Sequence, residues 1–219
     1  MVVAIDGPSG VGKSTVARGV AKRLGLPYLD TGAYYRAATL AVQSAGVDPG
    51  DGAAVYRAVT TSVIDFVDGH IELDGRDVRT DIRSDTVTAD VSEVSAHPDV
   101  RTAIVNLQRS WVGHHGGAAV VEGRDIGTVV FPHAPVKAFL TARPEVRAAR
   151  RAGDVEAAGR PVIRIASELA ARDRADSTRA ASPLTPAADA VVIDTSDWDA
   201  DGVIAAVLRL VEDVTPQPL

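Results

Sequence analysis

The chain has 219 residues, of which 46% are hydrophobic and 24% are charged, a composition typical of a globular domain and not of a disordered or membrane-embedded chain. Its formal net charge of −6 argues against broad binding of a nucleic-acid backbone. Cysteine is absent, which excludes disulfides, thiolate metal sites and cysteine nucleophiles.

The first 50 residues alternate between strand and helix patterns. An apolar β-branched run at 2–5 predicts a buried parallel strand, and the pattern at 14–24, closed by Gly25, predicts a helix. A short strand at 28–29 and a helix at 33–45 follow. The segment 48–52 is rich in Asp, Gly and Pro, which predicts a turn.

The next segment predicts a different architecture. Three short strands, at 63–67, 70–73 and 76–80, are separated by the two-residue turns Asp68-Gly69 and Asp74-Gly75. Asp-Gly pairs between apolar runs are typical of β-hairpins. We therefore predict a small antiparallel insertion at residues 50–85.

The remainder returns to alternating patterns. Helices are expected at 85–96, 98–112, 144–151, 162–172 and 199–211, and strands at 118–121, 136–140 and 191–193. Such alternation indicates a parallel sheet covered on both faces. The predicted fold is a single α/β domain over 1–219, with a doubly wound parallel sheet of about five strands. Trp111 and Trp198 are expected to be packing residues.

No apolar run approaches the roughly 18 residues that a membrane-spanning helix needs. The N-terminal residues lack the basic segment of a secretory signal. These features predict a cytoplasmic protein with small-molecule substrates and without a membrane or nucleic-acid partner, and we expect a monomer.

The strongest motif lies between the first strand and the first helix. It satisfies the pattern G-x-x-x-x-G-K-[ST] in full and comprises Gly7, Pro8, Ser9, Gly10, Val11, Gly12, Lys13 and Ser14, followed by Thr15. Backbone N–H groups of such a loop bind phosphates, the lysine reaches the outer phosphates, and the serine hydroxyl can bind Mg²⁺. The loop predicts that the protein binds ATP together with Mg²⁺. It does not identify the reaction, because ATPases, GTPases and small-molecule kinases all share this motif.

Two further segments follow predicted strands at the same edge of the sheet. They are Asp30-Thr31-Gly32-Ala33-Tyr34-Tyr35-Arg36 and Glu122-Gly123-Arg124-Asp125-Ile126-Gly127-Thr128. Together with 172–184, which includes Arg172, Asp176 and Arg179, they resemble the nucleoside monophosphate kinases, and most closely the bacterial cytidylate kinases. The resemblance runs from about residue 2 to 211. One departure is Glu122, where many members carry Asp.

The resemblance implies roles for individual residues. Thr31, Tyr35 and Arg36 would open the acceptor site, and Ser92 and Arg101 would contact a pyrimidine. Arg124 and Arg179 would bind the acceptor phosphate, and Arg172 and Asp176 the ribose. Asp125 would serve either the cytosine amine or Mg²⁺-bound water. A lid is implied at 150–163, where Arg150 and Arg160 are the candidates for neutralising the transferred phosphoryl group.

The expected reaction is phosphoryl transfer from Mg-ATP to CMP or dCMP. The candidate catalytic residues are Lys13, Arg124, Asp125, Arg150 and Arg160. The alternatives are a P-loop kinase for UMP or for a non-nucleotide metabolite, and a non-catalytic nucleotide switch. A switch of the small GTPase type would need an N-K-x-D stretch, which the sequence lacks.

Overall fold

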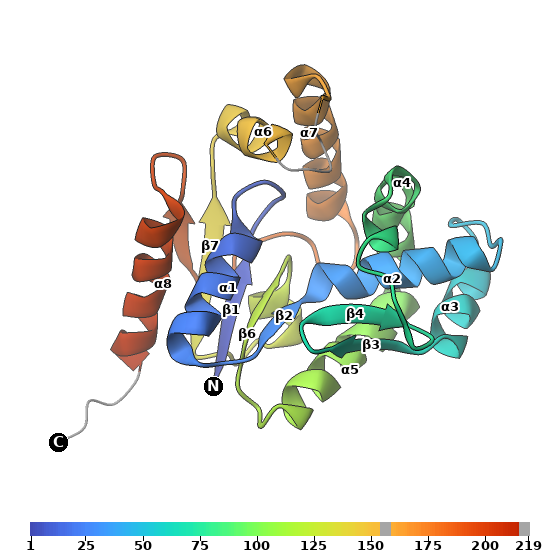
Figure 1. Cartoon of the computed structure of the whole chain (residues 1–219), viewed down its shortest axis with the longest axis horizontal. Helices are drawn as coiled ribbons and strands as arrows, with labels where there is room; N and C mark the ends of the chain where they lie inside the picture. The colour runs from blue at the N-terminus through green and yellow to red at the C-terminus, as the bar shows by residue number, and fades with distance from the viewer. Residues whose placement is uncertain (154–158, 215–219) are drawn as a thin grey trace.

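A computed structural model describes residues 1–153 and 159–214. Its centre is a five-stranded parallel sheet in the order β2-β6-β1-β7-β8 (Figure 1). These strands are β1 Val2–Asp6, β2 Tyr28–Asp30, β6 Ala119–Gly123, β7 Val136–Thr141 and β8 Val191–Asp194. The predicted doubly wound α/β fold is confirmed.

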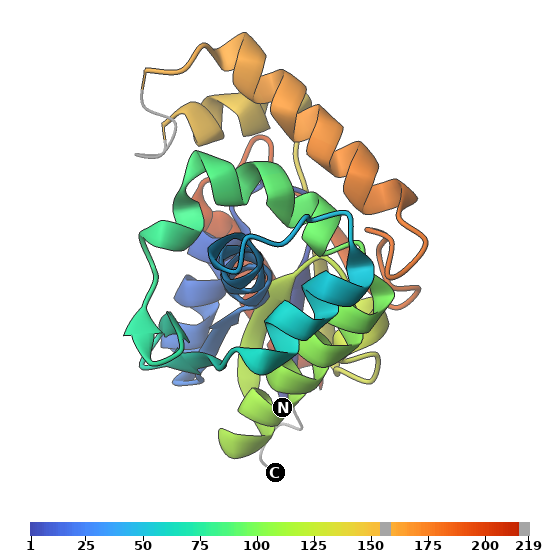
Figure 2. The same cartoon turned by 90° about the vertical axis from the view of Figure 1, so that its right-hand side faces the viewer.

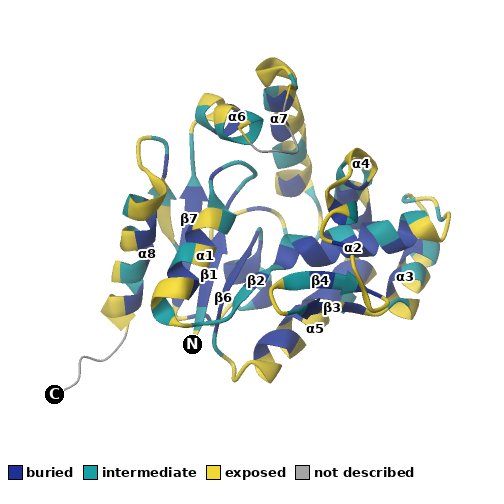
Figure 3. Cartoon of the chain, viewed as in Figure 1, coloured by how far each residue is buried: buried dark blue, intermediate teal, exposed yellow. Residues whose placement is uncertain are grey.

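Helices cover both faces of the sheet because successive residues of a buried strand point to opposite sides. On β1, Val3 and Ile5 pack with α1 (Lys13–Leu24) and α8 (Ala200–Val214). Ala4 belongs instead to the cluster beneath α2 (Thr31–Ser44) and α5 (Pro98–His114). Buried residues therefore fill β1, β6, β7 and the inner helix faces, whereas the edge strand β8 is exposed at Val191 and Val192, and the outer faces of the helices are exposed (Figure 3).

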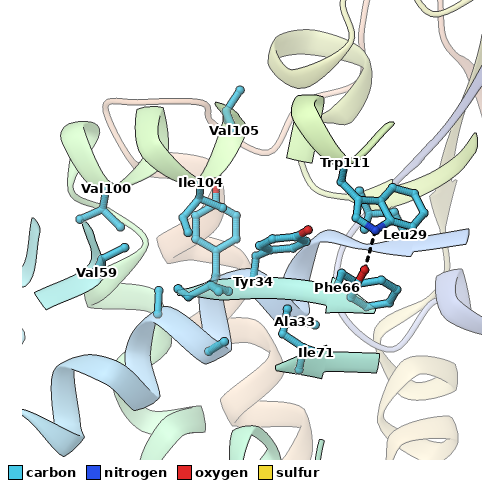
Figure 4. Packing of buried hydrophobic residues seen from close by; sticks show 14 of the residues in the cluster. Leu29, Ala33, Tyr34, Val59, Phe66, Ile71, Val100, Ile104, Val105 and Trp111 are labelled. Atoms are coloured by element: carbon cyan, nitrogen blue, oxygen red, sulfur yellow. Dashed lines mark hydrogen bonds between the residues drawn. The ribbon is translucent and has the colours of Figure 1, made fainter. Parts of the chain in front are cut away.

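The small antiparallel sheet consists of β3 (Ile64–Val67), β4 (His70–Leu73) and β5 (Arg76–Asp77). It packs on α2 and α5 through Phe66, whose ring lies 6.3 Å from that of Tyr34. The buried Trp111 donates from Nε1 to the Phe66 carbonyl at 2.6 Å (Figure 4). The packing role expected for Trp111 is confirmed, and the insertion is anchored to the main core.

Two elements differ from the sequence prediction. A helix not predicted from the sequence, α3 (Gly52–Thr61), precedes β3, and its buried face is small because Val55 and Val59 are its only buried residues. The Asp51 side chain caps it by accepting from the Ala54 N–H at 3.0 Å. The predicted strand 76–80 is shorter than expected, since the chain turns into a 3₁₀ helix at Asp81–Arg83.

Three further helices lie around the carboxyl ends of the strands (Figures 1 and 2). They are α4 (Asp85–Val94), α6 (Pro144–Ala152) and α7 (Val162–Thr178), and α6 packs on α7 through Ala148, Ile165 and Leu169. A π-helix, Ile126–Val130, follows β6. The predicted lid at 150–163 lies partly outside the described residues, which omit 154–158. No helix among the described residues is long and apolar enough to cross a membrane.

Candidate active site

The phosphate-binding loop connects β1 to α1 at the carboxyl edge of the sheet. Gly7 has φ 145°, and a Cβ at this position would lie 2.2 Å from the Leu140 carbonyl oxygen on β7. Gly10 has φ 79°, and a Cβ there would lie 3.0 Å from the Arg147 carbonyl oxygen on α6. Both positions need glycine because other residues rarely adopt these φ values and the neighbouring backbone leaves no room.

A cavity of about 440 Å³ extends from this loop toward α8. Its lining comprises Ser9–Val16 of the loop and α1, Arg150 and Arg151 of α6, and Thr195, Trp198, Asp199, Ala200 and Val203 beyond β8. A helix N-terminus and loop N–H groups at one end favour phosphates there. The space therefore fits a nucleoside triphosphate, and we call it the donor cavity.

Trp198 and Arg150 both line the donor cavity. Trp198, expected to be a packing residue, is 45% exposed at the cavity wall, which corrects that prediction. Arg150 donates to the Thr195 hydroxyl at 2.9 Å and to the Thr195 carbonyl at 2.7 Å, and reaches the Val11 carbonyl at 3.4 Å. Arg150 thus joins α6, the phosphate loop and the segment after β8.

Lys13 and Glu122 lie at the base of the loop. Burial, followed by repulsion from the Arg124 guanidinium, lowers the pKa of Lys13, whose Nζ donates to the Pro8 carbonyl at 2.7 Å. Burial raises the pKa of Glu122, which accepts a hydrogen bond from the Tyr28 hydroxyl. Burying a charged group is unfavourable unless a partner compensates it. A ligand that supplies a counter-charge or hydrogen bonds to Lys13 and Glu122 would therefore stabilise their charged forms.

Ser14 and Glu122 allow a test of whether Mg²⁺ fits. The Ser14 hydroxyl and the Glu122 carboxylate are hard oxygen donors, which Mg²⁺ prefers. Among the described residues, no three His, Asp or Glu side chains gather as a metal site. This sparse donor set suits Mg²⁺, which is usually held by one or two protein groups together with phosphates and waters.

A second cavity, of about 180 Å³, lies on the other side of the loop, and we call it the acceptor cavity. The structure brings to it almost every residue that the resemblance assigned to the acceptor: Thr31, Tyr35, Arg36, Arg101, Arg124, Asp125, Arg172, Asp176 and Arg179. Ser92 is half-buried on α4 but is not among the described lining residues, whereas Ser95 is. Ser95 Oγ donates to the Ser92 carbonyl at 3.2 Å.

The acceptor cavity is lined by guanidinium groups that repel one another. Burial and the neighbouring Arg124 lower the pKa of Arg172 to about 9, and burial and Arg101 lower the pKa of Arg179. Four buried donors of its lining have no hydrogen-bond partner within the described part of the chain: Tyr35 Oη, Arg101 Nε, Arg172 Nε and Arg179 Nη2. The same holds for one acceptor, Asp176 Oδ2. An anionic ligand that also carries a hydroxyl donor would satisfy these atoms and relieve the repulsion.

Asp125 is held in a buried network. Its carboxylate pairs with Arg101 at 2.5 Å, and the two side chains are 5% and 4% exposed. Asp6, at the end of β1, accepts from the Ile126 and Gly127 N–H groups at 2.8 Å each, and burial raises its pKa to about 6. The segment after β6 is therefore fixed both to α5 and to β1.

Arg124 connects the acceptor cavity to the phosphate loop. Its Nη1 donates to the Gly7 carbonyl at 2.6 Å, and its Nε lies 3.2 Å from an Asp176 oxygen on α7. Arg36 donates to the Ile82 carbonyl and the Thr88 hydroxyl, and the Thr31 hydroxyl donates to the Glu122 carbonyl. These contacts preorganise the arginines toward one space.

Arg160 is placed apart from both cavities as described. It pairs with Glu168 on α7 at 2.5 Å, and neither side chain is buried. Other lining residues had no ligand-binding role assigned from the sequence, among them Thr195, Trp198 and Asp199 on the donor side, and Ser95 on the acceptor side. The position of Thr195 just after a strand, at the ligand edge of a parallel sheet, was the available signal.

Comparisons with a family model and with curated relatives point to the same family. The sequence model of the family described as Cytidylate kinase matches residues 3–213. Cytidylate kinases of Corynebacterium glutamicum and Mycobacterium leprae are each 51% identical, over 97% of this chain and over 94% and 96% of the relatives. A solved structure, an uncharacterized protein from Eubacterium ventriosum, matches 97% of this chain and 98% of its own at 13% identity, with a TM-score of 0.53, a likeness of fold alone.

Proposed function

The chain belongs to the cytidylate kinase family, and on this premise we propose that it transfers the terminal phosphoryl group of ATP to CMP or dCMP. The observation that carries the proposal is that Ser9, Lys13 and Ser14 line both the donor and the acceptor cavity. A phosphoryl group moving between two nucleotides would cross at these residues.

On the donor side, the backbone N–H groups of the loop and Lys13 would bind the ATP phosphates. Thr195, Trp198 and Asp199 lie at the far end of the cavity, where the base would be expected. Arg150 would brace this end through Thr195 and Val11 instead of contacting the transferred group. These roles follow from the lining of the cavity and from the phosphate-binding chemistry of the loop.

On the acceptor side, Arg36, Arg124 and Arg179 would bind the CMP phosphate, since guanidinium groups bind phosphate oxygens in a bidentate manner. Arg101 and Asp125, with Ser92 or Ser95, would face the base. Arg172 and Asp176 would face the ribose. Catalysis would depend on holding the attacking phosphate oxygen in line with the terminal phosphate and on neutralising charge, without a covalent enzyme intermediate.

Mg²⁺ bound with ATP would neutralise charge on the phosphates. We propose that the Ser14 hydroxyl binds the ion and that Glu122, which lines the acceptor cavity together with Ser14, orients that hydroxyl. Lys13, which lines both cavities, would supply a second positive charge to the phosphates. The predictions of a monomer and of a cytoplasmic location stand as predictions.

A panel of acceptors in one coupled assay for ADP tests the proposal. With Mg-ATP as donor, CMP and dCMP should give turnover well above that with UMP, AMP or shikimate. Preferred turnover with UMP or with shikimate would replace the proposed acceptor by one of these alternatives. Nucleotide binding without ADP formation for any acceptor would indicate a nucleotide switch.

A further inference from the structure

Two carboxylates of helix α7 are linked to the phosphate loop. Each link is made by an arginine from another segment, which contacts both the carboxylate and the loop. Asp173 and Asp176 are three residues apart and therefore lie on neighbouring positions of one side of the helix. Asp176 contacts Arg124 from the segment after β6, and Asp173 contacts Arg147 from α6. Both arginines also donate to backbone carbonyls of the phosphate loop.

The two bridges have the same construction. In the first, Arg124 joins Asp176 to the Gly7 carbonyl, at 3.2 Å and 2.6 Å. In the second, Arg147 joins Asp173 to the Ser9 carbonyl, with Nη2 at 2.5 Å from the carboxylate and Nε at 2.7 Å from the carbonyl. Each bridge uses two nitrogens of a planar guanidinium, an arrangement that a lysine cannot reproduce.

The bridges differ in their relation to the acceptor. Arg124 and Asp176 line the acceptor cavity, so a nucleotide that contacts both competes with their mutual contact. Arg147 and Asp173 are not among the described residues that line either cavity. The second bridge is therefore the one that acceptor binding leaves in place.

The second bridge also contacts the part of the loop that lies between the two cavities. Ser9, whose carbonyl accepts from Arg147, is one of the described residues that line both cavities. The Arg147 side chain is 10% exposed and that of Asp173 is 22% exposed, so the pair is partly shielded from water and screening. Gly10 packs against Arg147 so closely that a Cβ on the glycine would lie 3.3 Å from the Arg147 Cβ.

We propose that Asp173 and Arg147 are positioning residues that couple the binding of ATP to the binding of CMP. The inference rests on the proposed function, because that function places the two substrates in the two cavities. When ATP phosphates bind to the loop and fix the position of Ser9, Arg147 transmits that position to α7 through its contact with Asp173. Helix α7 then presents Arg172 and Asp176 in the position that CMP requires.

Calorimetry measures the coupling directly. The dissociation constant of CMP is determined without and with saturating Mg²⁺ and β,γ-imido-ATP, and the ratio of the two constants is the coupling factor. We expect a factor of about ten in the original chain, within the usual range of allosteric coupling. In Asp173→Asn it should fall below about two, while CMP and the ATP analogue each bind alone within about threefold of the original affinities.

Further variants separate coupling from simple loss of structure. Asp173→Glu keeps the carboxylate and should recover most of the coupling, whereas Arg147→Lys keeps the charge but loses the double contact and should not. Glu145→Gln is the matched control: it is an acid-to-amide change on α6 that removes an exposed ion pair with Arg143, and it should keep the full factor. Arg147→Lys also provides the test if Asp173→Asn does not fold.

The outcomes are distinguishable. Full coupling in both Asp173→Asn and Arg147→Lys would overturn the inference, and so would a coupling factor of one in the original chain. If CMP fails to bind the original chain under any condition, the proposed function falls and the inference with it. A lost coupling factor with retained single-ligand affinities supports the inference.

Discussion

Replacing Asp125 by Asn should destabilise the fold by leaving the Arg101 charge buried without its partner. The two groups lie 2.5 Å apart, and their side chains are 4% and 5% exposed. Removing one member of a buried ion pair costs about 3–5 kcal/mol because the remaining charge loses both water and counter-charge. We expect the lower end, about 3 kcal/mol, because the Ser95 carbonyl accepts from Arg101 at 3.1 Å and the Tyr35 ring lies 5.0 Å away.

Equilibrium unfolding in urea at pH 7.5 measures this loss as the change in the free energy of unfolding. A double-mutant cycle with Arg101→Met sharpens the test, since the two changes together should cost less than the sum of the single changes. Asp81→Asn is a control for an exposed ion pair, with Arg76, and should change the free energy of unfolding by less than about 1 kcal/mol. A loss below about 1 kcal/mol for Asp125→Asn, or strictly additive effects, would refute the reasoning.

Three further changes test other parts of the site. Lys13→Ala should lower turnover with CMP at least a hundredfold, on the order expected for removing a charge that stabilises the transferred phosphoryl group. The midpoint of urea unfolding should stay nearly unchanged, and near-normal turnover would contradict the proposed role of Lys13. Ser95→Ala should reduce the preference for CMP over UMP more than Ser92→Ala, because Ser95 lines the acceptor cavity; the reverse order in kcat/KM would favour the original assignment of Ser92. The pKa of Asp6 is raised to about 6, so its contribution to stability is present below pH 4 and is lost as the pH rises to 6. The stability advantage of the original chain over Asp6→Asn should therefore shrink by up to roughly 3 kcal/mol across that window, and a constant difference would contradict the shift.

Most of the secondary structure could be predicted because its signals are contiguous. The apolar run of β1, the glycine after α1 and the Asp-Gly turns of the small sheet each act within a few residues. Helix α3 gave no such signal, since only Val55 and Val59 are buried and the Asp- and Gly-rich residues before it predict a turn. The π-helix after Asp125 was also missed, because its backbone is fixed by Asp6, about 120 residues earlier in the chain.

The sequence by itself determined the phosphate loop and the parallel sheet that carries it, and its family resemblance pointed to nine of the residues that line the acceptor cavity. Tertiary structure decided which groups face each other. Ser92 and Ser95 are nearly one helical turn apart, so periodicity could not choose between them. Arg147 and Arg150 each donate to a carbonyl of the phosphate loop, 138 and 139 positions away in the chain. A long guanidinium side chain binds whatever carbonyl or carboxylate the fold brings within reach, and local sequence carries no record of that neighbour.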